Sequence, residues 1–170
     1  MMKHIIFIML TTVLLQSSLL SKTIDINKIS KTSKKELVVY LHITGCSYCN
    51  AMSEFTFDDD AVLLYLKKNF HFIDINVSDK ERVLYNAKVT SAKQFSKDIG
   101  YAFYPSVLFF NRDGSVKYAA LGYKDEAEFL LILQYIHQGF YKKMQFAQYK
   151  KQVNFKKSNN EIDDSRKYAN

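Results

Sequence analysis

Apolar residues in the middle of the chain recur with the two periods that distinguish strands from helices. Apolar runs rich in β-branched and aromatic residues predict four strands, over residues 37–44, 70–77, 106–110 and 115–121. Helix-like spacing predicts helices over residues 46–57, 61–68, 91–99 and 125–140. Two stretches have weaker patterns. Residues 23–35 indicate a short helix or an extended lead-in, and residues 78–90 a loop or a short strand.

Turn and cap residues support these boundaries. The sequence Asn-Arg-Asp-Gly at residues 111–114 predicts a tight hairpin turn, so the strands on either side of it should be antiparallel. Gly100 predicts the end of the third helix, and Asp125 is expected to cap the fourth. The resulting order of strands and helices predicts an α/β sandwich, with helices on both faces of a mixed sheet.

The first residues, 1–21, have the layout of a secretory signal peptide. Lys3 and His4 form a short basic start, residues 5–15 are mostly apolar, and small serines follow. The apolar stretch is short for a membrane-spanning helix. An uncleaved N-terminal anchor is the alternative, and with either the rest of the chain is exported.

The remaining chain divides into one domain, residues 22–149, and a basic tail, residues 150–170. Most of the net charge of +7 lies near the tail, because residues 142–170 hold 8 Lys/Arg and 3 Asp/Glu. The tail lacks a periodic apolar face, so we expect disorder from about Lys156. A solvated end is the simpler interpretation, and weak attraction to anionic lipids or an acidic partner is the alternative. Nucleic acid is not an expected partner of an exported chain.

The two cysteines of the chain, Cys46 and Cys49, are separated by Ser47 and Tyr48. They follow the first predicted strand, at the N-terminus of the first predicted helix. Unpaired N–H groups and the helix dipole favour a thiolate there. Two intervening residues also allow the sulfurs to form a small, reversible disulfide. Structural disulfides of exported proteins are usually spread across a fold, so this pair points to redox chemistry.

A zinc site is the other common use of closely spaced cysteines, and it would need two further ligands. The histidines stand at positions 4, 42, 71 and 137, and none has a ligand-like spacing to the cysteines. We therefore expect no metal or other cofactor. His42 lies on the first predicted strand. The favoured interpretation is a core histidine whose ring nitrogens have hydrogen-bond partners, and the alternative is a group that tunes Cys46 electrostatically.

The chain resembles the thioredoxin fold, and within it the SoxW-like group of secreted thioredoxin-related proteins, over residues 36–140. Three motifs in order carry the resemblance. They are Gly-Cys-Ser-Tyr-Cys at residues 45–49 followed by Met52, Tyr104-Pro105 leading into the third strand, and Asp113-Gly114 followed by Leu-Gly-Tyr at 121–123. The resemblance implies a three-layer sandwich, with a central mixed sheet of about four to five strands flanked by helices.

The resemblance also implies roles for particular residues. Cys46 would be the exposed attacking sulfur and Cys49 the buried resolving one. Pro105 would be cis and face the disulfide, exposing the backbone of Tyr104 to an extended substrate strand. A trans proline that marks a strand start is the alternative. Ser47 and Tyr48 flank Cys46, and we expect them to shape the substrate surface; for Tyr48 a merely exposed turn residue is the alternative.

Two positions depart from the thioredoxin pattern. Tyr40 stands where thioredoxins bury a carboxylate beneath the pair, and Thr44-Gly45 replaces the tryptophan that usually precedes the motif.

Together these features predict a periplasmic thiol–disulfide oxidoreductase, exported by a Gram-negative bacterium or tethered to its inner membrane by an uncleaved signal. We expect it to reduce disulfides of exported proteins through the Cys46–Cys49 dithiol. Its partners would be protein disulfides or dithiols and a membrane electron donor or acceptor. A DsbA- or DsbC-like oxidase or isomerase is one alternative, and a non-catalytic thioredoxin-like binding or assembly module is another.

Overall fold

The computed structural model describes residues 23–167, and the predicted signal peptide lies outside the described residues. A four-stranded sheet forms the centre, in the order β3-β2-β6-β7. Its strands are β2 (Glu36–His42), β3 (Phe70–Asn76), β6 (Ser106–Phe110) and β7 (Val116–Leu121). β2 pairs with β3 in parallel and with β6 antiparallel, and β6 pairs with β7 antiparallel. The mixed sheet and the antiparallel hairpin are therefore confirmed.

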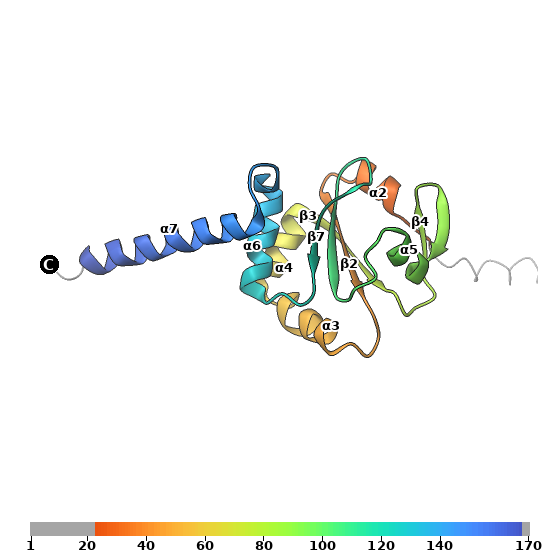
Figure 1. Ribbon diagram of the computed structural model, residues 1–170, viewed down its shortest axis with the longest axis horizontal. Coiled ribbons are helices and arrows are strands. Elements are labelled where there is room, and N and C mark those ends of the chain that lie inside the picture. The colour runs from red at the N-terminus through yellow and green to blue at the C-terminus, as the bar shows by residue number, and fades with distance from the viewer. Residues whose placement is uncertain (1–22, 168–170) are drawn as a thin grey trace, which may run out of the picture.

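Helices cover both faces of this sheet (Figure 1). One face packs against α4 (Asp60–Asn69) and α6 (Glu126–His137), and the other against α2 (Ile26–Thr32) and α5 (Ala92–Asp98). A strand covered on both faces has no polar side, which explains the unbroken apolar run of β2. The residues from Leu37 to Leu41 are all at most 1% exposed. The predicted three-layer sandwich is confirmed.

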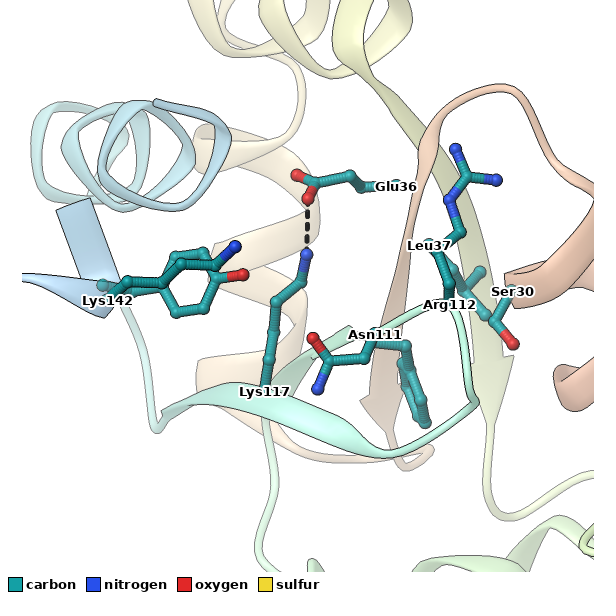
Figure 2. A pocket seen from close by; sticks show the side chains of 9 residues that line it. Ser30, Glu36, Leu37, Asn111, Arg112, Lys117 and Lys142 are labelled. Carbon is teal, nitrogen blue, oxygen red and sulfur yellow. Dashed lines mark hydrogen bonds and ion pairs between the residues drawn. The ribbon is translucent and has the colours of Figure 1, made fainter. Parts of the chain in front are cut away.

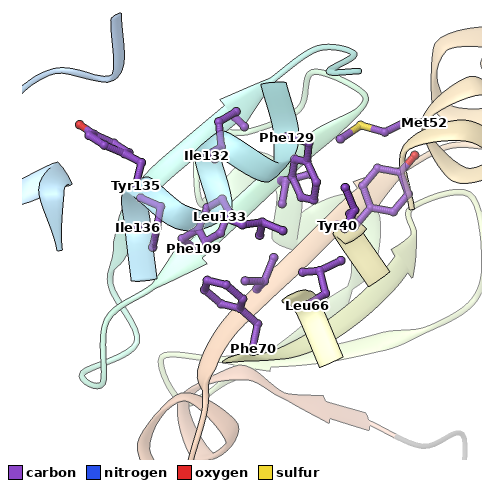
Figure 3. Close-up of a cluster of buried hydrophobic side chains, with 14 of the residues drawn as sticks. Tyr40, Met52, Leu66, Phe70, Phe109, Phe129, Ile132, Leu133, Tyr135 and Ile136 are labelled. Atoms are coloured by element: carbon purple, nitrogen blue, oxygen red, sulfur yellow. The ribbon is translucent and has the colours of Figure 1, made fainter. Parts of the chain in front are cut away.

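Alternate residues of β2 enter two separate hydrophobic clusters. Val38 and Tyr40 point into the larger cluster, with residues of α4, α6 and β6 (Figure 3). Leu37, Val39 and Leu41 point the other way, into a second core that they form with residues of α2 and α5. The β2 backbone, which leads directly to the cysteine pair, is thus held between two cores.

A second, smaller sheet lies beside the second core. It consists of β1 (Thr23–Asp25), β4 (Arg82–Tyr85) and β5 (Lys88–Ser91), in the order β1-β4-β5. The sequence predicts a loop or a short strand over residues 78–90, and the structure forms a hairpin there. Its turn holds Asn86 and Ala87 at φ 49° and 62°, a left-handed backbone usually supplied by glycine. Asn27 compensates: its Oδ1 accepts from the Asn86 N–H, and its Nδ2 donates to Asn86 Oδ1 at 3.2 Å.

The C-terminal part differs from the sequence prediction in two ways. The helix predicted to reach Phe140 ends at His137, because Gly139 takes φ 74° and a short 3₁₀ turn, η3 (Phe140–Lys142), follows. The tail predicted to be disordered from about Lys156 is helical instead: α7 spans Phe146–Lys167 and extends away from the domain (Figure 1). Its second half contains no Gly or Pro to interrupt a helix, although it has no apolar face.

The first turns of α7 are anchored to the domain. The ring of Tyr149 is buried against Tyr135 and Phe140, and Val153 packs on the same cluster. Lys150 Nζ pairs with a Glu128 carboxylate oxygen at 3.1 Å. Beyond this anchor the described side chains of the helix, residues 154–159, are exposed. Over residues 23–167, no helix combines the length and apolar character that crossing a bilayer requires.

Candidate functional site

The cysteine pair lies where β2 gives way to α3 (Ser47–Ala51). Gly45, at φ 78°, turns the chain, and Cys46 caps the helix: its Sγ accepts a hydrogen bond from the Cys49 N–H at 3.2 Å. Cys46 and Cys49 form a disulfide, with Cα atoms 5.2 Å apart. The Cys46 side chain is half-buried, whereas Cys49 is 1% exposed. An incoming sulfur therefore reaches Cys46 and not Cys49.

A π-helical turn, η2 (Met52–Thr56), directly follows α3. The Phe57 N–H donates to the Met52 carbonyl five residues earlier, at 3.0 Å. Such turns often occur at functional sites. The Thr56 hydroxyl donates to the Lys124 carbonyl at 2.6 Å, which fixes η2 to the loop between β7 and α6.

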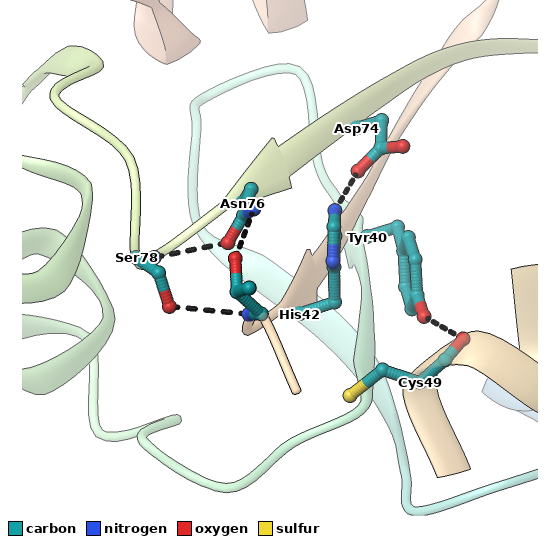
Figure 4. Close-up of polar contacts among 7 residues, drawn as sticks. Tyr40, His42, Cys49, Asp74, Asn76 and Ser78 are labelled. Atoms are coloured by element: carbon teal, nitrogen blue, oxygen red, sulfur yellow. Dashed lines mark hydrogen bonds and ion pairs between the residues drawn. The ribbon is translucent and has the colours of Figure 1, made fainter. Parts of the chain in front are cut away.

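Tyr40 supports the cysteine turn from beneath (Figure 4). The side chain is fully buried, and its hydroxyl donates to the Cys49 carbonyl at 3.0 Å. Burial raises the pKa of Tyr40, a hydrogen bond from Ser53 partly offsets this, and the charge of Asp74 raises the pKa further. Tyr40 therefore stays neutral over the physiological range and serves as a hydrogen-bond donor to the turn.

His42 belongs to the same polar group. Its ring stacks on Tyr40 with centroids 4.9 Å apart, and its Nε2 lies 2.8 Å from a carboxylate oxygen of Asp74 on β3. The ring thus has a polar partner, in line with the favoured interpretation of a satisfied histidine. Asn76, at the end of β3, donates to the Thr44 hydroxyl at 3.0 Å, and the Thr44 N–H donates to the Ser78 hydroxyl (Figure 4). These bonds hold the loop that leads to Cys46.

Pro105 lies at the same end of the sheet as the disulfide. Ser106 pairs with Leu41, so the chain before β6 runs beside the end of β2 that leads to Cys46. The Tyr104–Pro105 peptide bond is cis, and Pro105 is buried. The Pro105 carbonyl accepts from the Gly122 N–H at 2.8 Å, which joins this loop to the end of β7.

The side chain of Tyr104 does not face the cysteines. Its hydroxyl is hydrogen-bonded to the Ser96 hydroxyl at 2.7 Å, and its ring packs on the second core beside α5. Only the backbone of Tyr104 is therefore suited to contact a partner at Cys46. Ser47 is exposed, and Tyr48 is 70% exposed beside the disulfide.

Exposed apolar side chains gather around this end of the molecule. Tyr48 lies 6.5 Å from Tyr123, measured between ring centroids. Phe103, just before the Pro105 loop, is largely exposed, as are Phe55 on η2 and Leu121 at the end of β7. Sequence reasoning missed Phe55, Phe103 and Leu121 as surface groups, because no local pattern separates an exposed aromatic from a core one.

Within the described part of the chain, no group of three or more His, Cys, Asp or Glu side chains is arranged to hold a metal ion. A half-exposed sulfur at a helix N-terminus, disulfide-bonded to a buried one, is an arrangement suited to thiol–disulfide exchange.

Comparison with known proteins agrees with the fold. Residues 24–137 match the family model of the thioredoxin-like domain, and the chain belongs to that family. A thioredoxin-fold protein from Helicobacter pylori has a TM-score of 0.61 and 18% identity, covering 81% of this chain and 90% of that chain. A thioredoxin from Thermus thermophilus has a TM-score of 0.53 and 18% identity, covering 68% and 85%. No curated protein matches the sequence significantly.

At these identities the solved structures show the fold alone. The family and the Cys-x-x-Cys pair support a thiol–disulfide oxidoreductase.

Proposed function

We propose that this protein is a periplasmic thiol–disulfide oxidoreductase that reduces disulfides of exported proteins. The observation that carries the proposal is the unequal burial of the two sulfurs at the start of α3. Cys46 is reachable and caps the helix, whereas Cys49 is enclosed. That asymmetry supports Cys46 as the attacking sulfur and Cys49 as the sulfur that releases the client.

In the reducing direction both cysteines start as thiols. The Cys46 thiolate attacks one sulfur of a client disulfide, the client S–S bond breaks, and the second client sulfur leaves as a thiolate that takes up a proton. Cys49 then loses its proton and attacks Cys46 Sγ. The mixed disulfide breaks, the first client sulfur leaves, and the Cys46–Cys49 disulfide forms. The client gains two electrons and the protein loses two.

Client binding falls to the surface around Cys46. Ser47 and Tyr48 flank the attacking sulfur, and the backbone of Tyr104 next to Pro105 is available to an extended client strand. The Tyr104 side chain has no part in this binding, because Ser96 and the second core hold it.

The reducing direction requires a source of two electrons for each cycle. We propose a membrane-bound dithiol donor, which reduces the Cys46–Cys49 disulfide by the reverse exchange. Three motifs in the sequence, at residues 45–49, 104–105 and 121–123, support a place in the SoxW-like group. The basic N-terminal segment supports export, with tethering by an uncleaved signal as the alternative.

The proposal is tested by trapping. In Cys49→Ala the client cannot be released, so a mixed disulfide through Cys46 should accumulate when the variant is produced in its native compartment. It should survive non-reducing electrophoresis and disappear with dithiothreitol. Cys46→Ser is the matched control and should trap nothing. A Cys49→Ala variant that captures no more than Cys46→Ser would defeat the proposal.

The direction is tested separately by equilibrating the protein with glutathione buffers of known potential. A reductase should be more reducing than the glutathione couple. A potential well above that of glutathione would assign the protein to the oxidases or isomerases instead.

A further inference from the structure

A groove opens beside the redox site, between η2 and the loop that precedes α6. Its volume is about 480 Å³, and it is lined by Glu54, Phe55, Asp58, Asp59, Tyr123 and Glu126. Phe55 is 63% exposed and Tyr123 is 36% exposed, so two aromatic rings offer apolar surface to whatever enters. Exposed apolar surface of this kind, rimmed by polar groups, marks a contact site.

The groove is continuous with the surface around Cys46. Tyr123 lines it, and its ring centroid also lies 6.5 Å from that of Tyr48, one of the two residues between the cysteines. The hydrogen bond from Thr56 to the Lys124 carbonyl fixes the two walls to each other. A polypeptide attached to Cys46 through its own sulfur therefore has this groove next to its flanking residues.

The charge of the groove is opposite to that of the protein as a whole. Four of its six lining residues are acidic, although the chain carries a net charge of +7. None of the four forms an ion pair within residues 23–167, and Asp59 is occupied in capping α4. The neighbouring cation, Lys124, directs its ammonium group to the carbonyls of Leu121 and Tyr123.

We propose that this groove binds the client segment next to the reacting cysteine, and that it selects a Lys or Arg residue beside an apolar side chain. The carboxylates attract the cation, the aromatic rings accept the apolar side chain, and a guanidinium or ammonium group can also lie over a ring. The proposal rests on the proposed function, because it names the class of client that the same site takes. Acidic client segments are disfavoured by like-charge repulsion.

Binding can be measured without any redox step. A short, cysteine-free fluorescent peptide with the sequence Lys-Leu-Lys at its centre is titrated with the oxidised protein, and a second peptide carries Glu-Leu-Glu instead. We expect the lysine peptide to bind at least about tenfold more tightly, since several surface charge pairs each contribute a modest factor. The difference should shrink as salt is added. Equal affinities would overturn the proposal.

Variants locate the effect. Glu54→Gln/Asp58→Asn/Glu126→Gln should weaken the lysine peptide about tenfold and remove the preference, whereas Asp79→Asn, at an exposed carboxylate elsewhere, should keep it. Phe55→Ala should weaken binding more than Leu64→Ala, which removes a side chain of similar exposure from α4. A preference that survives in the triple variant, or an equal loss in Leu64→Ala, would overturn the proposal.

A redox arm separates this inference from the proposed function. The reduced protein is mixed with disulfide-linked versions of both peptides, and each rate is divided by that for neutral hydroxyethyl disulfide. Faster reduction of the lysine peptide supports the groove. If the peptides bind as expected but no disulfide is reduced, docking stands and the reductase fails. If disulfides are reduced without a preference and the peptides bind equally, the reductase stands and the groove fails.

Discussion

The hydroxyl of Tyr40 donates a hydrogen bond to the carbonyl of Cys49, joining the buried centre of β2 to the first turn of α3. The oxygen atoms are 3.0 Å apart. In the thioredoxin pattern a carboxylate occupies this strand position. Here a neutral phenol fixes the backbone of the resolving cysteine, so the side chain beneath the pair has a positioning role.

Tyr40→Phe tests that role. The variant keeps the ring, which packs edge-on against Phe57, and removes only the hydroxyl. The Cys49 carbonyl still accepts from the Met52 N–H, so we expect the free energy of unfolding to fall by about 1 kcal/mol. We also expect a change in the reduction potential of the Cys46–Cys49 pair, measured against glutathione.

Tyr118→Phe is the matched control for Tyr40→Phe. Over residues 23–167, no side-chain hydrogen bond of the Tyr118 hydroxyl is found. Its removal should therefore leave the reduction potential unchanged. If both variants shift the potential equally, Tyr40 acts through general packing and not through its bond to Cys49.

The raised pKa of Tyr118 predicts that the protein loses stability in alkali. Burial raises its pKa to about 12, whereas an unfolded tyrosine ionises near pH 10. Between these values the unfolded chain has lost a proton that the folded chain keeps. The free energy of unfolding should therefore fall as the pH rises from about 10 to about 12. Below about pH 10 both states keep the proton, so Tyr118 should not make the stability depend on pH.

Urea unfolding across this range, followed with tyrosinate absorbance, measures the effect. Burial also raises the pKa values of Tyr40 and Tyr135, so Tyr118→Phe should reduce the alkaline loss without abolishing it. An identical pH dependence in wild type and Tyr118→Phe would show that this tyrosine ionises normally in the folded state.

The central sheet and the cysteine pair could be predicted from the sequence because their signals are local. A strand buried on both faces is apolar throughout, as residues 37–41 are. Caps are equally local: Asp59 accepts from the Val62 N–H and Asp125 from the Glu128 N–H. These features depend on residues a few positions apart, and a single chain displays them directly.

The features that were missed depend on distant residues. The β4–β5 turn has no glycine and is stabilised by Asn27, 59 residues before Asn86. The two sides of the groove are joined by the bond from Thr56 to Lys124, 68 residues away. No local pattern records either contact. The second half of α7 was missed for a different reason. The prediction of a helix relied on an apolar face, and this part of α7 has none because it extends away from the domain.

The ion pair of Glu36 and Lys117 is expected to affect the free energy of unfolding mainly because the Lys117 cation is buried. The Lys117 side chain is 5% exposed, and its ammonium group pairs with the Glu36 carboxylate (Figure 2). The same ammonium group lies 5.4 Å from the centroid of the Tyr141 ring. Glu36→Gln leaves that cation without a counter-charge and should cost about 2 kcal/mol. Lys117→Met keeps the apolar stem and should cost less, because the Glu36 side chain is 31% exposed whereas that of Lys117 is 5% exposed.

The double variant Glu36→Gln/Lys117→Met completes the cycle. Once the cation is absent, the loss of its partner should matter little, so the double variant should be more stable than Glu36→Gln alone. Urea unfolding of the four proteins gives the coupling energy. Additive effects of the two single changes would mean that Lys117 is stabilised mainly by Tyr141 and solvent.

The anchor of α7 predicts where the chain can be shortened. Tyr149 is buried and Val153 packs on the core, whereas the described side chains after Val153 are exposed. Deleting residues 156–170 should change the free energy of unfolding by less than about 0.5 kcal/mol. Deleting residues 146–170 removes the buried ring and should cost about 3 kcal/mol or more. Similar losses from both deletions would contradict this placement of the anchor.

The lysines near α7 define a test of membrane association. Six lysines and no acidic residue occur between residues 142 and 160, and the acidic residues at 161, 163 and 164 offset the charge of Arg166 and Lys167. We therefore expect attraction to anionic lipid to come from the first half of α7 and the turn before it. Lys150 is left unchanged in the test because it pairs with Glu128.

Lys151→Gln/Lys156→Gln/Lys157→Gln should weaken sedimentation with phosphatidylserine vesicles at low salt by at least about tenfold, since each lysine near such a surface contributes about 1 kcal/mol. Lys80→Gln/Lys93→Gln/Lys97→Gln removes the same net charge from exposed positions elsewhere on the domain, and should bind nearly as wild type does. Equal weakening in the two triple variants would mean that net charge alone attracts the protein, with no specific part for α7. Binding that is unchanged in both would rule out electrostatic association through these lysines.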